Sequence, residues 1–252
     1  MGIQLIFGFF GGIVQTDNAL WFLIAATSIK YATLMPLFYL FFSSILFAEC
    51  PQGFKEPKIT YFNIIVCGDN NVSSIRLQHA ANVLKGIIDF NDDGQPDNPK
   101  IAIRLSSEHS SFLVISSEIY ENRYADLSQN ENFTIVYEDE MILDASEFDP
   151  TLEEAFHLVT QYGFAAEYPY EFGEVKDSEI ALLMDIARGG YFEDIPPTYP
   201  HNAFYTYSDK TCDYGCQITE FTYWAVTSLR NQQSGNRRFL EIKDEWKLNT
   251  RE

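Results

Sequence analysis

Basic residues are scarce in this chain of 252 residues, which has 17 Lys and Arg against 36 Asp and Glu and a formal net charge of −19. Proteins that bind nucleic acid or anionic membranes need clustered Lys and Arg to neutralise phosphate groups. The charge balance therefore argues against both partners and is compatible with binding cations. Because aromatic residues make up 15% of the chain, it is not a disordered acidic tail.

The chain also lacks the GxSxG, P-loop and GxGxxG motifs, which argues against a serine hydrolase of that type and against nucleotide enzymes. Cysteines are few but even in number, as a disulfide framework in an exported protein requires: Cys50, Cys67, Cys212 and Cys216. The natural pairing joins Cys50 to Cys67 and Cys212 to Cys216, although four cysteines allow three connectivities. The CDYGC spacing would also suit zinc, but no second Cys or His pair stands nearby.

Charge is almost missing from residues 1–48, where Asp17 and Lys30 cancel each other. An apolar run that ends in small residues before a polar chain is typical of a signal peptide, with cleavage after Ala48. A functional start at Met35 would leave a short signal peptide. The alternative is an uncleaved membrane anchor, since residues 31–48 are just long enough to span a bilayer. We therefore expect one acidic, secreted domain over residues 49–252, with membrane contact only through the leader.

Two sequons agree with export, at Asn71 and Asn132. Strands are predicted at 59–67, 101–105, 111–115 and 133–137, and helices at 74–90, 152–162, 178–188 and 218–229. Gly163 and Gly189 are the expected C-terminal stops of two of these helices. Strands and a helix come first and helices follow, so the expected fold class is α+β.

The segment from Asp89 to Asp97 has the pattern of a calcium loop, with oxygen side chains at alternating positions around Gly94. The predicted ligands are the side chains of Asp89, Asn91, Asp93 and Asp97 and the carbonyl of Gln95. The pattern resembles the calcium repeats of thrombospondin type 3 and dockerin modules. Pro96 and Lys100 depart from the EF-hand form. The alternative is a solvated Asp/Asn/Gly turn that needs no ion.

Glu153-Glu154-Ala155-Phe156-His157 matches HExxH with the first His replaced by Glu. In HExxH two metal ligands lie one helical turn apart, and the Glu between them activates the metal-bound water. By this pattern Glu153 and His157 are candidate zinc ligands and Glu154 is the candidate base. The third ligand should come from a later helix, where Glu220 is the best candidate.

EEAFH followed by a Tyr-rich stretch and EFTYW resembles the lethal-factor type of gluzincin zinc metallopeptidases. That resemblance implies a peptide or protein substrate, and it makes Tyr205 or Tyr207 the candidate that stabilises the oxyanion. The segments EEAFH, MDIARGG, TCDYGC and TEFTYW are also similar to those of a family of exported proteins with no established activity. The resemblance covers most of residues 49–252 and places the calcium-like loop and the EEAFH helix in one domain.

Other interpretations of these residues stay open. Glu154 three residues after Thr151 forms a capping box, and Glu153 and Glu154 suit the first turn of a helix without any metal. The two carboxylates and His157 lie opposite the apolar face of their helix, so they form a site only if another element covers them. Asp185 is either an outer carboxylate directed at His157 or the ion-pair partner of Arg188. His201 is a further candidate site residue in the Tyr-rich loop.

Two functions follow from these patterns. One is an exported, zincin-like metal protein, with metallopeptidase activity as the expected chemistry. The other is a calcium-stabilised extracellular domain without enzymatic activity, in which the EEAFH helix is purely structural.

Overall fold

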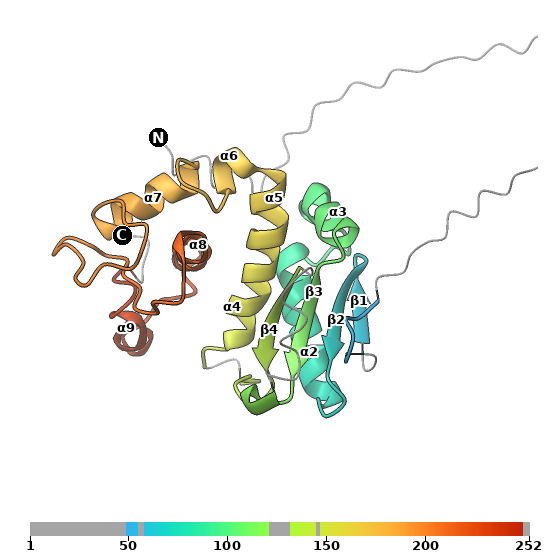
Figure 1. Cartoon of the computed structure of the whole chain (residues 1–252). Helices are drawn as coiled ribbons and strands as arrows, with labels where there is room; N and C mark the ends of the chain where they lie inside the picture. The colour runs from blue at the N-terminus through green and yellow to red at the C-terminus, as the bar shows by residue number, and fades with distance from the viewer. Residues whose placement is uncertain (1–48, 55–57, 121–131, 145–146, 249–252) are drawn as a thin grey trace, which may run out of the picture.

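The computed structural model describes residues 49–54, 58–120, 132–144 and 147–248. The predicted leader therefore lies outside the described residues. A small sheet and its helices come first in the chain and a helical half follows, which confirms the α+β prediction (Figure 1). Within the described residues, no helix is both long and apolar enough to cross a membrane.

The sheet contains four strands in the order β1-β2-β3-β4. The strands are β1 Lys58–Tyr61, β2 Ile64–Gly68, β3 Ser111–Ile115 and β4 Phe133–Tyr137. β1 pairs with β2 antiparallel, whereas β2 with β3 and β3 with β4 are parallel. The predicted single strand over 59–67 is thus wrong, because Phe62 and Asn63 adopt positive φ and turn the chain into a hairpin.

Two helices, α2 Ser74–Ile88 and α3 Pro99–Ser107, connect β2 to the parallel strand β3. The predicted helix over 74–90 is confirmed, with Ser73 as its N-cap. The predicted strand over 101–105 is wrong, because Pro99 starts a helix whose buried side chains are Ile101, Ala102 and Leu105. That spacing of one, three and four residues is helical, and a short apolar run does not distinguish the two structures by itself.

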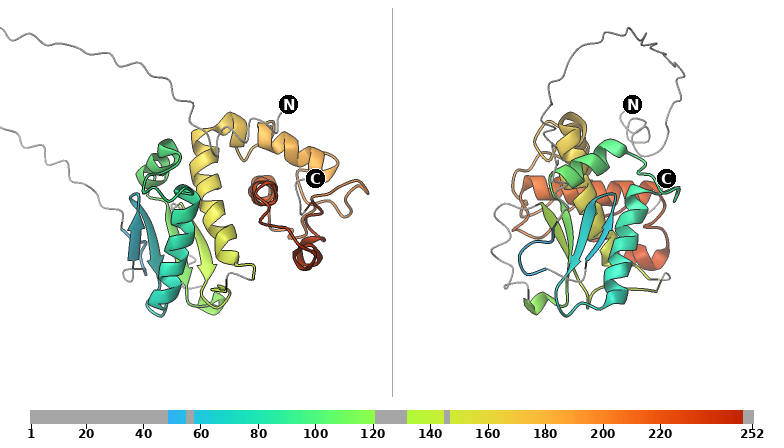
Figure 2. Two further views of the ribbon diagram at one scale, coloured as in Figure 1. Left: turned by 180° about the vertical axis from the view of Figure 1, so that it is seen from behind. Right: turned by 90° about the vertical axis from the view of Figure 1, so that its right-hand side faces the viewer.

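The next helix crosses the middle of the molecule, between the sheet and the C-terminal helices (Figures 1 and 2). It is built from α4 Pro150–His157, a π-helical segment η2 Leu158–Phe164 and α5 Ala165–Glu167. Gly163 does not end it, contrary to the prediction. An added Cβ there would lie 2.8 Å from Ile101 Cγ2, so the glycine permits close packing against α3.

The C-terminal half is helical: α6 Pro169–Phe172, α7 Glu179–Arg188, α8 Tyr214–Leu229 and α9 Asn236–Ile242. Ser178 caps α7 at its start, and Gly189 ends it in the left-handed conformation, as predicted. Phe156 of α4 packs in a core formed with α7, α8 and α9, while Ala155 and Leu158 pack in the core beneath the sheet. The central helix is therefore buried on two sides and joins both halves.

Candidate functional site

The first candidate ligands lie on α4, whose start is fixed by Asp149 rather than by the predicted Thr151 cap. The Asp149 side chain accepts a hydrogen bond from the Thr151 backbone N–H at 3.1 Å, and Pro150 occupies the first turn. The same carboxylate contacts His79 Nε2 at 2.5 Å, which ties the helix start to α2. Glu153 and His157 then lie one turn apart on the face directed toward α8.

The second element of the site is α8, which supplies the cover that the α4 face requires. Asp213 caps α8 by accepting from the Cys216 backbone N–H at 2.9 Å, and a disulfide joins Cys212 to Cys216 at the same end. This arrangement places Glu220 opposite His157. The predicted convergence of the three candidate ligands therefore occurs.

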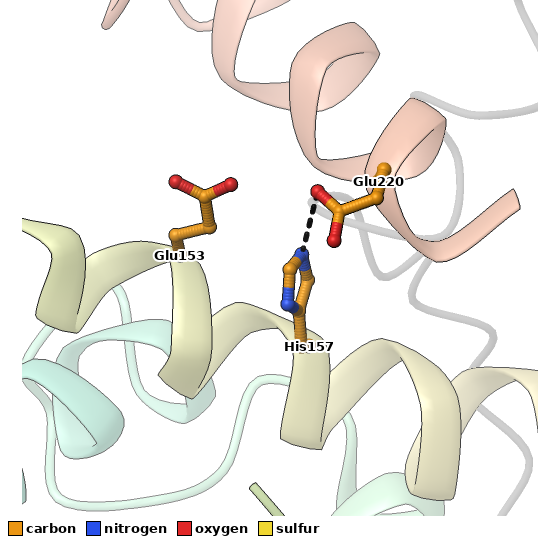
Figure 3. Close-up of side chains that lie close together, drawn as sticks. All are labelled: Glu153, His157 and Glu220. Atoms are coloured by element: carbon orange, nitrogen blue, oxygen red, sulfur yellow. Dashed lines mark ion pairs between the residues drawn. The ribbon is translucent and has the colours of Figure 1, made fainter. Parts of the chain in front are cut away.

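Glu153, His157 and Glu220 each offer one ligand atom, and these atoms all lie within 4.8 Å of one another. His157 Nε2 is 3.7 Å from a Glu220 carboxylate oxygen, and Figure 3 shows Glu220 at the upper end of the imidazole ring with Glu153 beside it on the same helix as His157. Within the described residues, no other three His, Cys, Asp or Glu side chains converge in this way. The group could hold a metal ion.

The two candidate ligand carboxylates are largely but not fully buried and lie close to each other. Burial raises the pKa of both Glu153 and Glu220, and the charge of Glu153 raises that of Glu220 further. Each of these side chains therefore holds a proton more tightly than an exposed glutamate does. A divalent cation between them would replace that proton and neutralise both charges.

His157 is 8% exposed, and burial lowers its pKa to about 4, so the imidazole is neutral at physiological pH. Its Nε2 atom is buried and has no hydrogen-bond partner. Tyr223 packs edge-on against the ring, with centroids 5.9 Å apart. A neutral, fixed imidazole with a free nitrogen facing two carboxylates fits a metal ligand, because a buried polar atom without a partner is otherwise costly.

Glu154, the candidate base, lies at the other edge of the imidazole. One of its carboxylate oxygens is 3.9 Å from His157 Nδ1, too far for a hydrogen bond. Burial raises its pKa to about 8, with additional contributions from Glu153 and Glu140. Its side chain remains 35% exposed, so it can exchange protons with solvent.

The structure distinguishes the two candidate tyrosines. Tyr205 is fully buried, and its hydroxyl donates to the Gln217 carbonyl at 2.9 Å, which gives it a packing role. The Tyr207 hydroxyl lies near enough to Glu220 to lower the pKa of that carboxyl, and burial raises the pKa of Tyr207 itself. Tyr207 is thus the tyrosine beside the ligand group.

Asp185 and His201 do not join this group. Asp185 accepts from the Arg188 guanidinium at 2.6 Å and from the Tyr214 hydroxyl at 3.1 Å, so the ion-pair interpretation is confirmed. His201 is exposed in the loop that follows α7. Neither contacts Glu153, His157 or Glu220 in the structure.

Sequence reasoning missed two charged residues near the end of the chain. The charge of Glu245 raises the pKa of Glu153, and that of Arg238 lowers it. Glu245 is held in place because its carbonyl accepts from the Thr206 backbone N–H at 2.8 Å. Nothing in the local sequence signals these roles: Glu245 is next to a β-bridge between Tyr205 and Trp246, and Arg238 is held by Gln233 and by the Phe148 ring.

In the calcium-like loop, side-chain oxygens bond the loop's own backbone. Asp89 is buried, and its carboxylate accepts from the backbone N–H groups of Asp93 and Gly94, each at 3.0 Å, and from Lys85 Nζ at 3.1 Å. Three further oxygens accept loop N–H groups in the same manner: those of Asn91, Asp93 and Asp97. These bonds form a closed turn without an ion, and calcium binding stays a prediction.

Both predicted disulfides are present, Cys50 with Cys67 and Cys212 with Cys216. They indicate folding in an oxidising environment. Asn71 is exposed and Asn132 is half-buried, and their glycosylation stays a prediction.

Comparison with protein-family models, with curated proteins and with solved structures finds no match to this chain, so the function must be inferred from the site itself.

Proposed function

We propose that this protein is an exported metal-binding protein of zincin-like design, in which Glu153, His157 and Glu220 hold a zinc ion. The observation that carries the proposal is the buried Nε2 atom of His157, which has no hydrogen-bond partner and lies 3.7 Å from Glu220. Without a cation, the fold would bury this atom beside two carboxylates at a cost in free energy.

Zinc is the ion that the donor set fits best. Zinc binds imidazole nitrogen and carboxylate oxygen in one tetrahedral site, and a site with three protein ligands leaves one position for water. Two carboxylates make the site harder than one with two histidines, so it should also accept manganese. The neutral state of His157 favours binding, since the ring need not lose a proton first.

The remaining residues orient the ligands. Tyr207 lies beside Glu220 and would fix that carboxylate by donating to it, while Tyr223 supports the His157 ring from its edge. The disulfide at the start of α8 fixes the end of the helix that carries Glu220. Partners that orient the ligands commonly contribute 10- to 100-fold to metal affinity.

The proposal is tested by equilibrium zinc binding and metal analysis of the purified protein. We expect one zinc ion per chain and a rise in melting temperature with zinc, because a ligand bound only by the folded state stabilises it. The variant His157→Ala should lose at least about 100-fold in affinity, and Glu220→Gln about 10-fold or more.

Two exposed residues supply matched controls, His201→Ala and Glu193→Gln. Both should bind zinc like the parent protein. Equal zinc content in His157→Ala and His201→Ala would show that zinc binds elsewhere and would remove the basis of the proposal.

Peptide hydrolysis is the second candidate function, favoured by Glu154 near His157 and by Tyr207 near Glu220. A bound zinc ion would supply Lewis-acid activation of water and of a carbonyl oxygen. Glu154, with a pKa of about 8 and partial exposure, could accept and return a proton, and the Tyr207 hydroxyl could donate to a developing oxyanion. The test is cleavage of a peptide library by the zinc-loaded protein. Glu154→Gln should abolish this cleavage and leave zinc binding unchanged. Cleavage by the Glu154→Gln variant would exclude Glu154 as the base.

A further inference from the structure

A groove of about 360 Å³ lies among α2, the central helix and α8, and neither Glu153 nor Glu220 lines it. Its walls are apolar and come from α2, the central helix and the C-terminal end of α8; they include Ile87, Phe156, Val159, Phe164 and Val226. This volume is within the range of small-molecule sites. No zinc ligand lines the groove, so it is separate from the candidate metal site.

Arg230 is the basic residue that lines this groove, in a protein with a large excess of acidic residues. Its guanidinium lies 3.7 Å from the centroid of the Phe90 ring and forms no ion pair with any described residue. Phe90 also lines the groove and is 64% exposed. By contrast, other arginines of the described chain pair with carboxylates, namely Arg104, Arg188, Arg237 and Arg238.

The groove also contains a glycine that the fold itself does not require. Gly86 lies inside α2, where glycine costs about 1 kcal/mol relative to alanine. An added Cβ at Gly86 would meet no atom within 4 Å. The space beside it is therefore not needed for packing of the protein.

We infer that this groove binds a single-chain carboxylate, with the alkyl chain along the apolar walls and the carboxylate on the guanidinium of Arg230. The apolar lining suits a chain without hydrogen-bonding groups. The Asp97 carboxylate at the rim already accepts from the Phe90 backbone N–H at 2.9 Å, which leaves Arg230 as the group that selects charge. Guanidinium groups bind carboxylates in a bidentate, charge-assisted manner.

The inference is tested with sodium decanoate by calorimetry on the purified protein, with 1-decanol and sodium acetate as partial probes. We expect decanoate to bind at one site per chain, and decanol and acetate to bind at least tenfold more weakly. Arg230→Gln should weaken decanoate by about 10- to 100-fold and leave decanol unchanged, since a charged hydrogen bond contributes roughly 1.5–3 kcal/mol. Gly86→Leu should block the groove and abolish binding.

Two controls test whether the effect on decanoate binding is specific to Arg230 and independent of the metal site. Arg237→Gln changes an arginine that is 71% exposed and outside the groove, and it should bind decanoate like the parent. Zinc binding should be unchanged in Arg230→Gln, so the result does not depend on the metal site. The inference is overturned by absent decanoate binding, by equal affinity in Arg230→Gln, by equal loss in Arg237→Gln, or by self-association through Phe90 in place of binding.

Discussion

Two tyrosines that are two residues apart in the sequence have different environments, and this difference can be measured. The Tyr205 hydroxyl donates to a backbone carbonyl in a fully buried position, whereas the Tyr207 hydroxyl lies beside the candidate ligand Glu220 and lowers its pKa. We therefore expect the Tyr205 hydroxyl to affect the free energy of unfolding, because it makes a buried hydrogen bond. We expect the Tyr207 hydroxyl to affect zinc affinity, because it would orient Glu220.

We expect Tyr205→Phe to lower the free energy of unfolding by about 1 kcal/mol, since it removes a buried hydrogen bond to the Gln217 carbonyl, and to keep zinc affinity. Tyr207→Phe should instead weaken zinc by about tenfold with little change in stability of the metal-free protein. Denaturant unfolding and zinc titration on both variants check this. The reverse pattern would show that Tyr205, not Tyr207, supports the ligand group.

At the scale of elements, the central helix shows which features could be predicted from the sequence and which could not. The EEAFH spacing correctly placed Glu153 and His157 one turn apart, and the later helix supplied Glu220 as expected. Gly163 was mistaken for a helix end because its partner, α3, was itself predicted as a strand. A helix stop is a local signal, whereas close packing of a glycine against Ile101 depends on contacts far apart in the chain.

Two helical glycines therefore give opposite predictions. Gly163→Ala should lower the free energy of unfolding by about 1–3 kcal/mol, since the new Cβ would lie 2.8 Å from Ile101 Cγ2. Gly86→Ala should raise it by about 0.5–1 kcal/mol, because alanine favours the helix and meets no atom within 4 Å. Denaturant unfolding of both variants checks this pair, and stabilisation by Gly163→Ala would mean that α3 does not pack closely here.

At the scale of the whole molecule, acidic side chains extend into the interior. Glu174 is half-buried between the central helix and α8; it accepts a hydrogen bond from Thr219, and Gln161 also interacts favourably with its charged form. Burial raises its pKa from 4.5 to about 7, against the effect of these interactions. The sequence predicted the excess of acid and its restriction to residues 49–252, but not which carboxylates the fold buries, because burial follows from helix packing.

The raised pKa gives stability a defined dependence on pH. The folded state holds the Glu174 proton more tightly than the unfolded chain, so the contribution of this group to stability is fully present below about pH 4.5 and is lost as pH rises through about 7. Glu174→Gln should therefore stabilise the protein by about 1–2 kcal/mol at pH 8 and have little effect at pH 4.5, after discounting for partial exposure. Unfolding at both pH values, with the exposed Glu193→Gln as control, checks this; a pH-independent difference would contradict it.

The central claim is that Glu153, His157 and Glu220 hold one zinc ion, and anomalous diffraction at the zinc edge from zinc-loaded crystals tests it most directly. The account predicts a single strong peak roughly 2.0–2.2 Å from the His157 Nε2 atom and from one oxygen of each carboxylate. A peak at other residues, or none at this group when zinc is in excess, would contradict it.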